Sequence, residues 1–116
     1  MTKVTFFKRD GVYFGFRETG HTGYGESGND ILCAALSAMT MLIVNTIEVA
    51  YDARVDYTID DGAATITVKV PEILSDDGER RFAISGLLMG YMVQLADMQE
   101  EHYEFISVDE DENENI

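Results

Sequence analysis

The sequence predicts one α+β domain in which two helices form a second layer against a mixed or antiparallel sheet. Three observations support this fold class. Strand-like segments come in two pairs, each joined by a turn signal, and a helical segment follows each pair. The length of 116 residues fits a single domain. The predicted order is therefore β-β-α-β-β-α-β, with hairpins dominating the sheet.

Residues 3–8 and 12–17 form the first predicted pair of strands. Large apolar side chains at positions 12, 14 and 16 alternate with Tyr, Gly and Arg, which is typical of a strand with one buried face. Arg, Asp and Gly at residues 9–11 provide the hairpin turn.

Asp30 is a favourable N-cap for a helix that we expect to run to about residue 50. This helix has no charged side chain before Glu48. A helix that is apolar nearly all round is buried on most sides. It is therefore either the central helix against the sheet or part of a subunit contact.

The second predicted pair of strands covers residues 54–59 and 63–70. Asp61 and Gly62 form a strong two-residue turn signal between them. Pro71 ends the second of these strands, because proline donates no backbone hydrogen bond.

A second helix is predicted at about residues 79–99. Its expected apolar face consists of Phe82, Leu87, Leu88, Tyr91, Met92 and Leu95. Gly86 and Gly90 form a stripe of small residues, for which packing is the simplest role. Residues 103–108 are predicted to form a last strand, so we place the domain at residues 1–108. The acidic tail at residues 109–116 is expected to be disordered.

The charge of the chain limits its partners. Eight basic residues against 22 acidic ones give a net charge of -14, which disfavours direct binding of nucleic acid. The same field favours a basic partner, such as a ribosomal protein or cationic peptide, although charge alone is also explained by solubility.

We expect a cytoplasmic protein without a membrane segment. The longest uncharged run, residues 31–47, is shorter than a bilayer requires, and the chain opens on a strand-like segment rather than a signal peptide. A single cysteine forms no internal disulfide, which agrees with a reducing compartment.

The only cysteine, Cys33, lies in the first turn of the first predicted helix. Amide groups and the dipole at a helix N-terminus favour a thiolate there. A lone cysteine in an apolar run is usually just a small core residue. However, a loop with Gly20, Gly23, Gly25 and Gly28 precedes it, and glycines suit a loop that moves or approaches a ligand closely.

His21 lies at the other end of this glycine loop and is the candidate base for Cys33. The other histidine, His102, lies among acidic residues at the expected end of the second helix. By base rate His21 is a surface residue without a role, so its candidacy depends on Cys33. Tyr24 in the same loop either lines the pocket or is simply exposed.

Two further residues have open assignments. Asp30 caps the helix, and as a third member of a catalytic group it would instead orient the imidazole. Ser37 lies one helical turn after Cys33 and either hydrogen-bonds near the thiol or bonds back to the Cys33 carbonyl.

The chain offers no convincing cofactor or metal site. Gly23, Gly25 and Gly28 match a dinucleotide-binding spacing, but the preceding strand belongs to a hairpin rather than to a βαβ unit. One cysteine and two distant histidines lack the spacing of a zinc site. We therefore expect no cofactor and no metal.

At Gly20-His21 and at residues 30–37, Asp-Ile-Leu-Cys-Ala-Ala-Leu-Ser, the chain resembles the ribosomal-processing cysteine protease family, Prp. The resemblance covers nearly the whole chain in length and element order. Thr22 replaces an alanine often found there, and the long acidic tail is not typical of the family.

The resemblance implies a cysteine endopeptidase that removes a short N-terminal extension from a large-subunit ribosomal protein, number twenty-seven. The family's cysteine and histidine fall on Cys33 and His21, and its aspartate and serine fall on Asp30 and Ser37 in supporting roles. It also implies a homodimer and cleavage after an aromatic pair. By analogy with other helix-borne nucleophiles, the backbone N–H of Ala34 is a candidate oxyanion donor.

Two alternatives have distinct signatures. A non-enzymatic, acidic ribosome-associated binding protein would use Cys33 only for packing, so its thiol would react slowly. A nucleotide-binding protein would be stabilised by nucleotide, which we do not expect.

Overall fold

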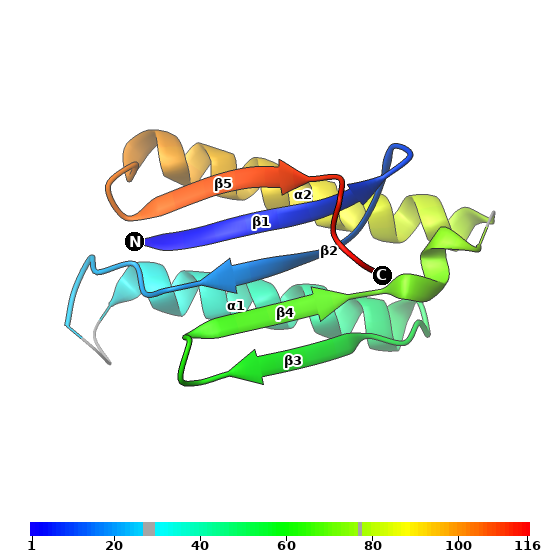
Figure 1. Ribbon diagram of the computed structural model, residues 1–116, viewed down its shortest axis with the longest axis horizontal. Coiled ribbons are helices and arrows are strands. Elements are labelled where there is room, and N and C mark those ends of the chain that lie inside the picture. The colour runs from blue at the N-terminus through cyan, green and yellow to red at the C-terminus, as the bar shows by residue number, and fades with distance from the viewer. Residues whose placement is uncertain (27–29, 77) are drawn as a thin grey trace.

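The computed structural model describes residues 1–26, 30–76 and 78–116, and a five-stranded sheet forms its frame (Figure 1). The sheet order is β3-β4-β2-β1-β5. Three strand pairs are antiparallel, whereas β1 and β5 are parallel, so the sheet is mixed. The strands are β1 (Thr2–Arg9), β2 (Val12–Thr19), β3 (Asp56–Asp60), β4 (Thr65–Lys69) and β5 (Ile106–Asp111).

Both long helices lie behind the sheet in Figure 1, which confirms the α+β fold in two layers. The first helix, α1 (Ile31–Asn45), continues as a π-helical turn, η1 (Thr46–Ala50). The second is α2 (Glu79–Glu101), and a short 3-10 helix, η2 (Pro71–Leu74), follows β4. The core lies between the layers, where the Tyr91 ring meets Phe6 and Phe16 edge-on at 5.6 and 5.2 Å.

The first hairpin has the predicted turn. Asp10 and Gly11 adopt φ values of 51° and 80°, which match the left-handed conformations that a tight hairpin turn requires. A register shift after Phe7 leaves Phe14 of β2 without a partner in β1. The rings of Phe7 and Phe14 lie 5.8 Å apart, and both side chains are fully buried.

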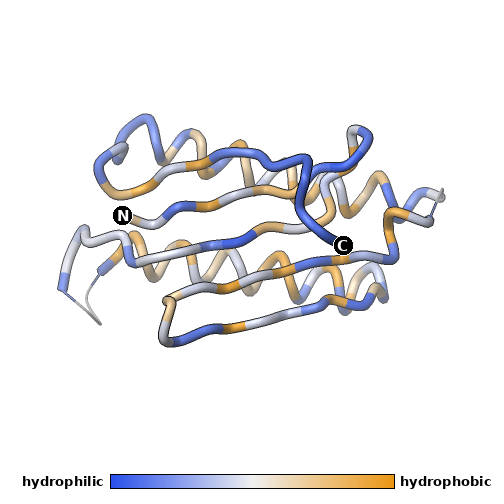
Figure 2. Tube along the Cα trace, in the orientation of Figure 1, coloured by the Kyte–Doolittle hydropathy of each residue, from blue (hydrophilic) through white to orange (hydrophobic). Residues whose placement is uncertain are grey.

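The C-terminal segment differs from the expected disordered tail. β5 extends to Asp111, and the chain then crosses the face of the sheet opposite the helices (Figure 1). This crossing segment is largely hydrophilic (Figure 2). Composition predicted disorder because the segment has few apolar groups, but ion pairs to the sheet hold it instead.

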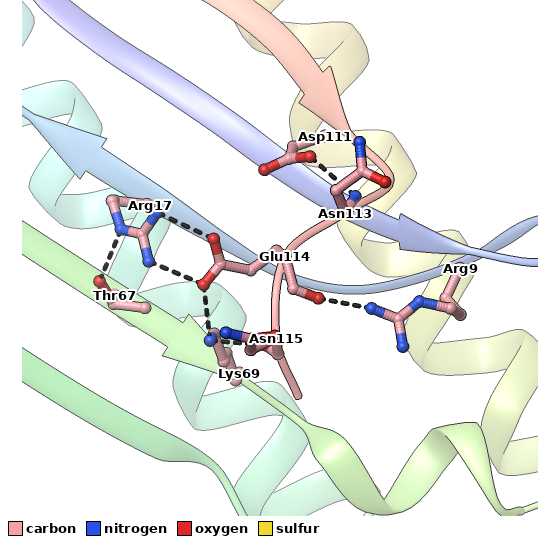
Figure 3. A network of polar contacts seen from close by, with 8 residues as sticks. All are labelled: Arg9, Arg17, Thr67, Lys69, Asp111, Asn113, Glu114 and Asn115. Carbon is pink, nitrogen blue, oxygen red and sulfur yellow. Dashed lines mark hydrogen bonds and ion pairs between the residues drawn. The ribbon is translucent and has the colours of Figure 1, made fainter.

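Glu114 makes these ion pairs (Figure 3). Its carboxylate accepts bonds from both terminal nitrogens of Arg17, at 2.9 and 3.1 Å, and from Lys69 Nζ at 2.8 Å. The two cationic groups lie over the ring of Phe7, 5.1 and 5.4 Å from its centroid. Bonds from Arg17 and Lys69 lower the pKa of Glu114 to about 2. The tail thus fixes the cations that cover Phe7.

The second hairpin has a longer turn than expected. Four residues separate β3 from β4, and Ala64 adopts a left-handed φ of 49°. The N–H of Ala64 donates to the carbonyl of Asp61 at 3.2 Å, and Asp60 Oδ1 accepts from the N–H of Ala63 at 3.1 Å. These bonds, rather than a two-residue Asp61-Gly62 turn, reverse the chain. Pro71 follows β4 as predicted.

Three expectations for the second half of the chain are wrong in detail. Phe82 is 72% exposed, because the sheet-facing stripe of α2 begins at Ile84. A Cβ at Gly86 or Gly90 would meet nothing within 4 Å, so neither glycine packs against an element in the described part of the chain. Residues 103–105 are a turn, and the last strand begins at Ile106.

The combined helix from Ile31 to Ala50 also differs from expectation. With 20 helical residues it is long and apolar enough to cross a membrane by length and composition, and only a third of its most apolar window is buried. Leu36, Ile43 and Ile47 face the core. Exposed Met41, Leu42 and Val49 leave the other side of the helix apolar and uncovered.

Candidate active site

Cys33 lies at one end of the sheet, where the glycine loop after β2, the start of α1 and the β3–β4 turn meet (Figure 1). Two adjoining hollows share His21, Cys33 and Ser37 in their linings. One, of about 250 Å³, extends to the β3–β4 turn. The other, of about 500 Å³, is bordered by the glycine loop. Cys33 is half-buried and borders both hollows.

Asp30 fixes the first turn of α1, as its N-cap role predicts. Its Oδ1 accepts bonds from the N–H groups of Leu32 and Cys33, each at 3.0 Å. Its Oδ2 accepts from the amides of Tyr24 and Gly25 at 3.1 and 3.3 Å. The carboxylate thus joins the helix start to the loop.

The hydroxyl of Thr22 is a fifth donor to Asp30. This bond, together with the amide bonds, holds the pKa of the Asp30 carboxyl well below its usual range. None of the five donors belongs to His21. Of the two assignments left open by the sequence, this geometry favours capping over orientation of the imidazole.

Gly20 holds the base of the loop in place and is not a free hinge. It adopts a φ of +86°, and a Cβ there would lie 2.5 Å from the carbonyl oxygen of Met1. Its N–H donates to the Ala64 carbonyl at 2.9 Å, and its carbonyl accepts from the Thr2 hydroxyl at 3.2 Å. His21, the next residue, is exposed and borders both hollows.

The other three glycines have different situations. Gly23 adopts a φ of +72° and is exposed, with open space around its Cα. Gly25 is held by its bond to Asp30. Gly28 lies outside the described residues. Among the described loop glycines, Gly23 is the one with a left-handed φ and open space around it.

Two supporting assignments need correction or remain open. The N–H of Ala34 donates to the carbonyl of Asp30 at 3.0 Å, so it is already engaged and does not point free toward an oxyanion. Ser37 lines both hollows, but within the described ranges it makes neither of the two hydrogen bonds considered for it. In the same ranges, His21 and Cys33 form no hydrogen bond with each other.

The site contains residues that the sequence did not single out. Thr22 is only 1% exposed, and its hydroxyl lies 3.3 Å from Cys33 Sγ. Glu18, in the wall of the smaller hollow, accepts bonds from the hydroxyls of Thr40 at 2.8 Å and Tyr91 at 2.5 Å. Burial raises the pKa of Glu18. No local sequence pattern predicts the role of either residue, because their hydrogen-bond partners are distant in the sequence.

Tyr24 does not line either hollow. Its ring packs edge-on against His102 and Phe105, at centroid distances of 5.6 and 5.2 Å. It therefore attaches the glycine loop to the connection between α2 and β5.

No cofactor or metal arrangement is apparent in the part of the chain that the structure describes. Within residues 1–26, 30–76 and 78–116, no three His, Cys, Asp or Glu side chains gather as metal ligands would. β2, which precedes the glycine loop, pairs antiparallel with both of its neighbours. The loop thus lacks the βαβ setting of a dinucleotide site.

Comparisons with known proteins identify the family to which the chain is similar. The family model described as Cysteine protease Prp matches residues 1–107. The ribosomal processing cysteine protease Prp of Staphylococcus aureus is 30% identical over 87 residues, which cover 75% of this chain and 76% of that protein.

Solved structures give the same result. An S. aureus Prp with a covalently linked product peptide has 27% identity and a TM-score of 0.79, covering 96% of this chain and 100% of its own. An S. aureus Prp with a substrate peptide has 25% identity and a TM-score of 0.75 at the same coverage. A Streptococcus mutans protein has 26% identity and a TM-score of 0.77, covering 95% of this chain and 96% of its own.

Proposed function

The chain belongs to the cysteine protease Prp family, and on this premise we propose that it removes a short N-terminal extension from large-subunit ribosomal protein twenty-seven during ribosome assembly. One observation supports the assignment most directly: Cys33 and His21 border the same two adjoining hollows. A peptide that occupies both hollows passes directly over the sulfur.

In the proposed mechanism, Cys33 is the nucleophile and His21 is the general base. His21 accepts the thiol proton, and the sulfur attacks the scissile carbonyl carbon. The tetrahedral intermediate collapses to a thioester as the imidazolium gives its proton to the leaving amine. Water, deprotonated by His21, then attacks the thioester, releases the carboxylate and restores the thiol. The backbone before His21 is held by the bond from the Gly20 N–H to the Ala64 carbonyl, while the His21 side chain is exposed. In the proposed mechanism, the exposed ring rotates toward the sulfur.

The proposed substrate fits the charge of the enzyme and the names of its relatives. A net charge of -14 attracts a basic ribosomal precursor. The S. aureus relative is named for ribosomal processing, and its structures contain a substrate peptide or a covalently linked product peptide. Together these favour an extended peptide segment as the bound form of the substrate.

Incubation of the purified protein with the precursor tests this proposal. Mass spectrometry should detect a shortened precursor with the wild type, and no shortening with Cys33→Ser or His21→Ala. A precursor with alanines in place of its aromatic pair serves as the substrate control and should remain intact. Cleavage that survives in Cys33→Ser would overturn the assignment of the nucleophile.

We also propose a cytoplasmic homodimer that uses the uncovered side of the α1–η1 helix. Leu42 is 61% exposed and Val49 is 82% exposed on this apolar side. Burial of such side chains against a second copy removes apolar surface from water. Light scattering should report a dimer for the wild type and a monomer for Leu42→Glu. Val93→Glu, an equivalent change on α2 where Val93 is 51% exposed, is the matched control.

A further inference from the structure

The hydroxyl of Thr22 lies between two acidic groups of the site. Thr22 is almost completely buried, with 1% exposure. Its Oγ1 is hydrogen-bonded to Asp30 Oδ2 and lies 3.3 Å from Cys33 Sγ. One side-chain oxygen therefore contacts both the carboxylate that caps the helix and the sulfur at the centre of the site.

A threonine hydroxyl has one proton to donate and two lone pairs that accept. The ionised carboxylate of Asp30 is acceptor-only, so the bond between the two side chains uses the hydroxyl proton. The N–H of Tyr24 donates to one lone pair of Oγ1 at 3.4 Å, so the other lone pair is the one available to the sulfur. A thiol at Cys33 donates its proton to that lone pair, whereas a thiolate has no proton to donate.

From this geometry we propose that Thr22 is a positioning residue that holds Cys33 as a neutral thiol in the resting enzyme. A hydrogen bond accepted from the neutral form of a group disfavours its ionisation. Ionisation of Cys33 either places a thiolate against the oxygen lone pair or requires the hydroxyl to leave Asp30. Both changes have a cost, so proton transfer to His21 in the presence of substrate becomes the step that creates the thiolate.

Other charged groups around Cys33 also affect whether its sulfur is a thiol or a thiolate. His21 in the glycine loop, Asp30 at the N-cap of α1 and Glu18 in β2 line the hollows that Cys33 borders. Asp60 and Asp61, at the end of β3 and in the turn after it, line the smaller hollow. The dipole of α1 favours the thiolate, while the carboxylates oppose it. Thr22→Val removes one of the five donors to Asp30, but the four backbone amides remain and keep its carboxyl ionised at the pH of the assay. Thr22→Ser retains the hydroxyl, so the difference between the two variants reports the hydroxyl.

The pH dependence of Cys33 alkylation tests the proposal, which rests on the proposed role of Cys33 as nucleophile. Iodoacetamide is the probe, and intact mass gives the rate, because the chain has a single cysteine. Thr22→Val removes the hydroxyl at nearly constant shape, and Thr22→Ser retains a hydroxyl. We expect the midpoint of the alkylation profile to fall by about 0.5 pH unit or more in Thr22→Val, the scale of one ordinary hydrogen bond. Thr22→Ser should keep the wild-type midpoint.

An unchanged midpoint in Thr22→Val would overturn the proposal, and so would a raised one, since the hydroxyl would then donate to the thiolate. This assay uses no peptide, so it is independent of whether the ribosomal precursor is the substrate. The S–H stretching band of the wild type gives a second measurement that needs no variant. A band shifted to the frequency of a bonded thiol supports the proposal, and a band at the frequency of an unbonded thiol contradicts it.

Discussion

Glu114 offers a sharp test of how the C-terminal segment is attached. We predict that Glu114→Gln lowers the free energy of unfolding at pH 7, because it removes the charge that pairs with Arg17 and Lys69. The carboxyl pKa falls from its ordinary value of 4.5 to about 2 in the folded protein. This difference corresponds to at most about 3.4 kcal/mol of stability. Partial exposure of the pairs allows water and salt to screen them, so about 1–2 kcal/mol is a realistic loss.

The sign of the pH dependence follows from the lowered pKa. Glu114 in the unfolded chain takes up its proton near pH 4.5, before the folded protein does so near pH 2. Its contribution is therefore complete above pH 4.5 and disappears as the pH falls toward 2. By about pH 3 more than half of the difference between the wild type and Glu114→Gln should be gone.

Urea unfolding of both proteins at pH 7 and pH 3 measures this difference. Glu112→Gln is the matched control, since Glu112 is exposed and makes no hydrogen bond or ion pair with the described residues. Equal stability of the wild type and Glu114→Gln at pH 7 would refute the reasoning, as would a difference that does not change between pH 7 and pH 3.

Four further changes have defined outcomes. Gly20→Ala should cost about 1–3 kcal/mol, because it forces a left-handed residue against a carbonyl oxygen, and a stable variant in thermal melts would contradict the strain. Gly86→Ala on the open side of α2 should instead stabilise by about 0.5–1 kcal/mol, which differential scanning calorimetry can detect. Tyr91→Phe should cost about 1–2 kcal/mol in urea unfolding, because buried Glu18 loses one of its two hydroxyl donors; equal midpoints would argue against that bond. Asp30→Ala should lower Tm by a few degrees and by more than Asp30→Asn, which keeps an acceptor for the helix amides.

Features with local causes were predictable from the sequence. The first hairpin follows from alternation and an Asp-Gly turn, the start of α1 from Asp30, and the end of β4 from Pro71. Each of these signals involves residues within a few positions of one another, and the structure contains all three.

Features with distant partners were not predictable in this way. The parallel pairing of β5 with β1 and the bonds of Glu114 join opposite ends of the chain. In the site, Asp30 as a cap could be predicted, but the contact of Thr22 with both Asp30 and Cys33 depends on how the glycine loop folds back. The Ala34 amide was a candidate oxyanion donor by analogy with other helix-borne nucleophiles, but the carbonyl of Asp30 accepts from it in the first turn of α1.

The position of Cys33 at the junction of two hollows determines an order of events under the proposed mechanism. After the first chemical step, one fragment remains esterified to the sulfur, while the fragment with the new amino group is held only by non-covalent contacts on the opposite side. Departure of that fragment opens a path for the second reactant. A burst of the amine fragment ahead of the acid fragment is therefore the kinetic pattern that this architecture produces.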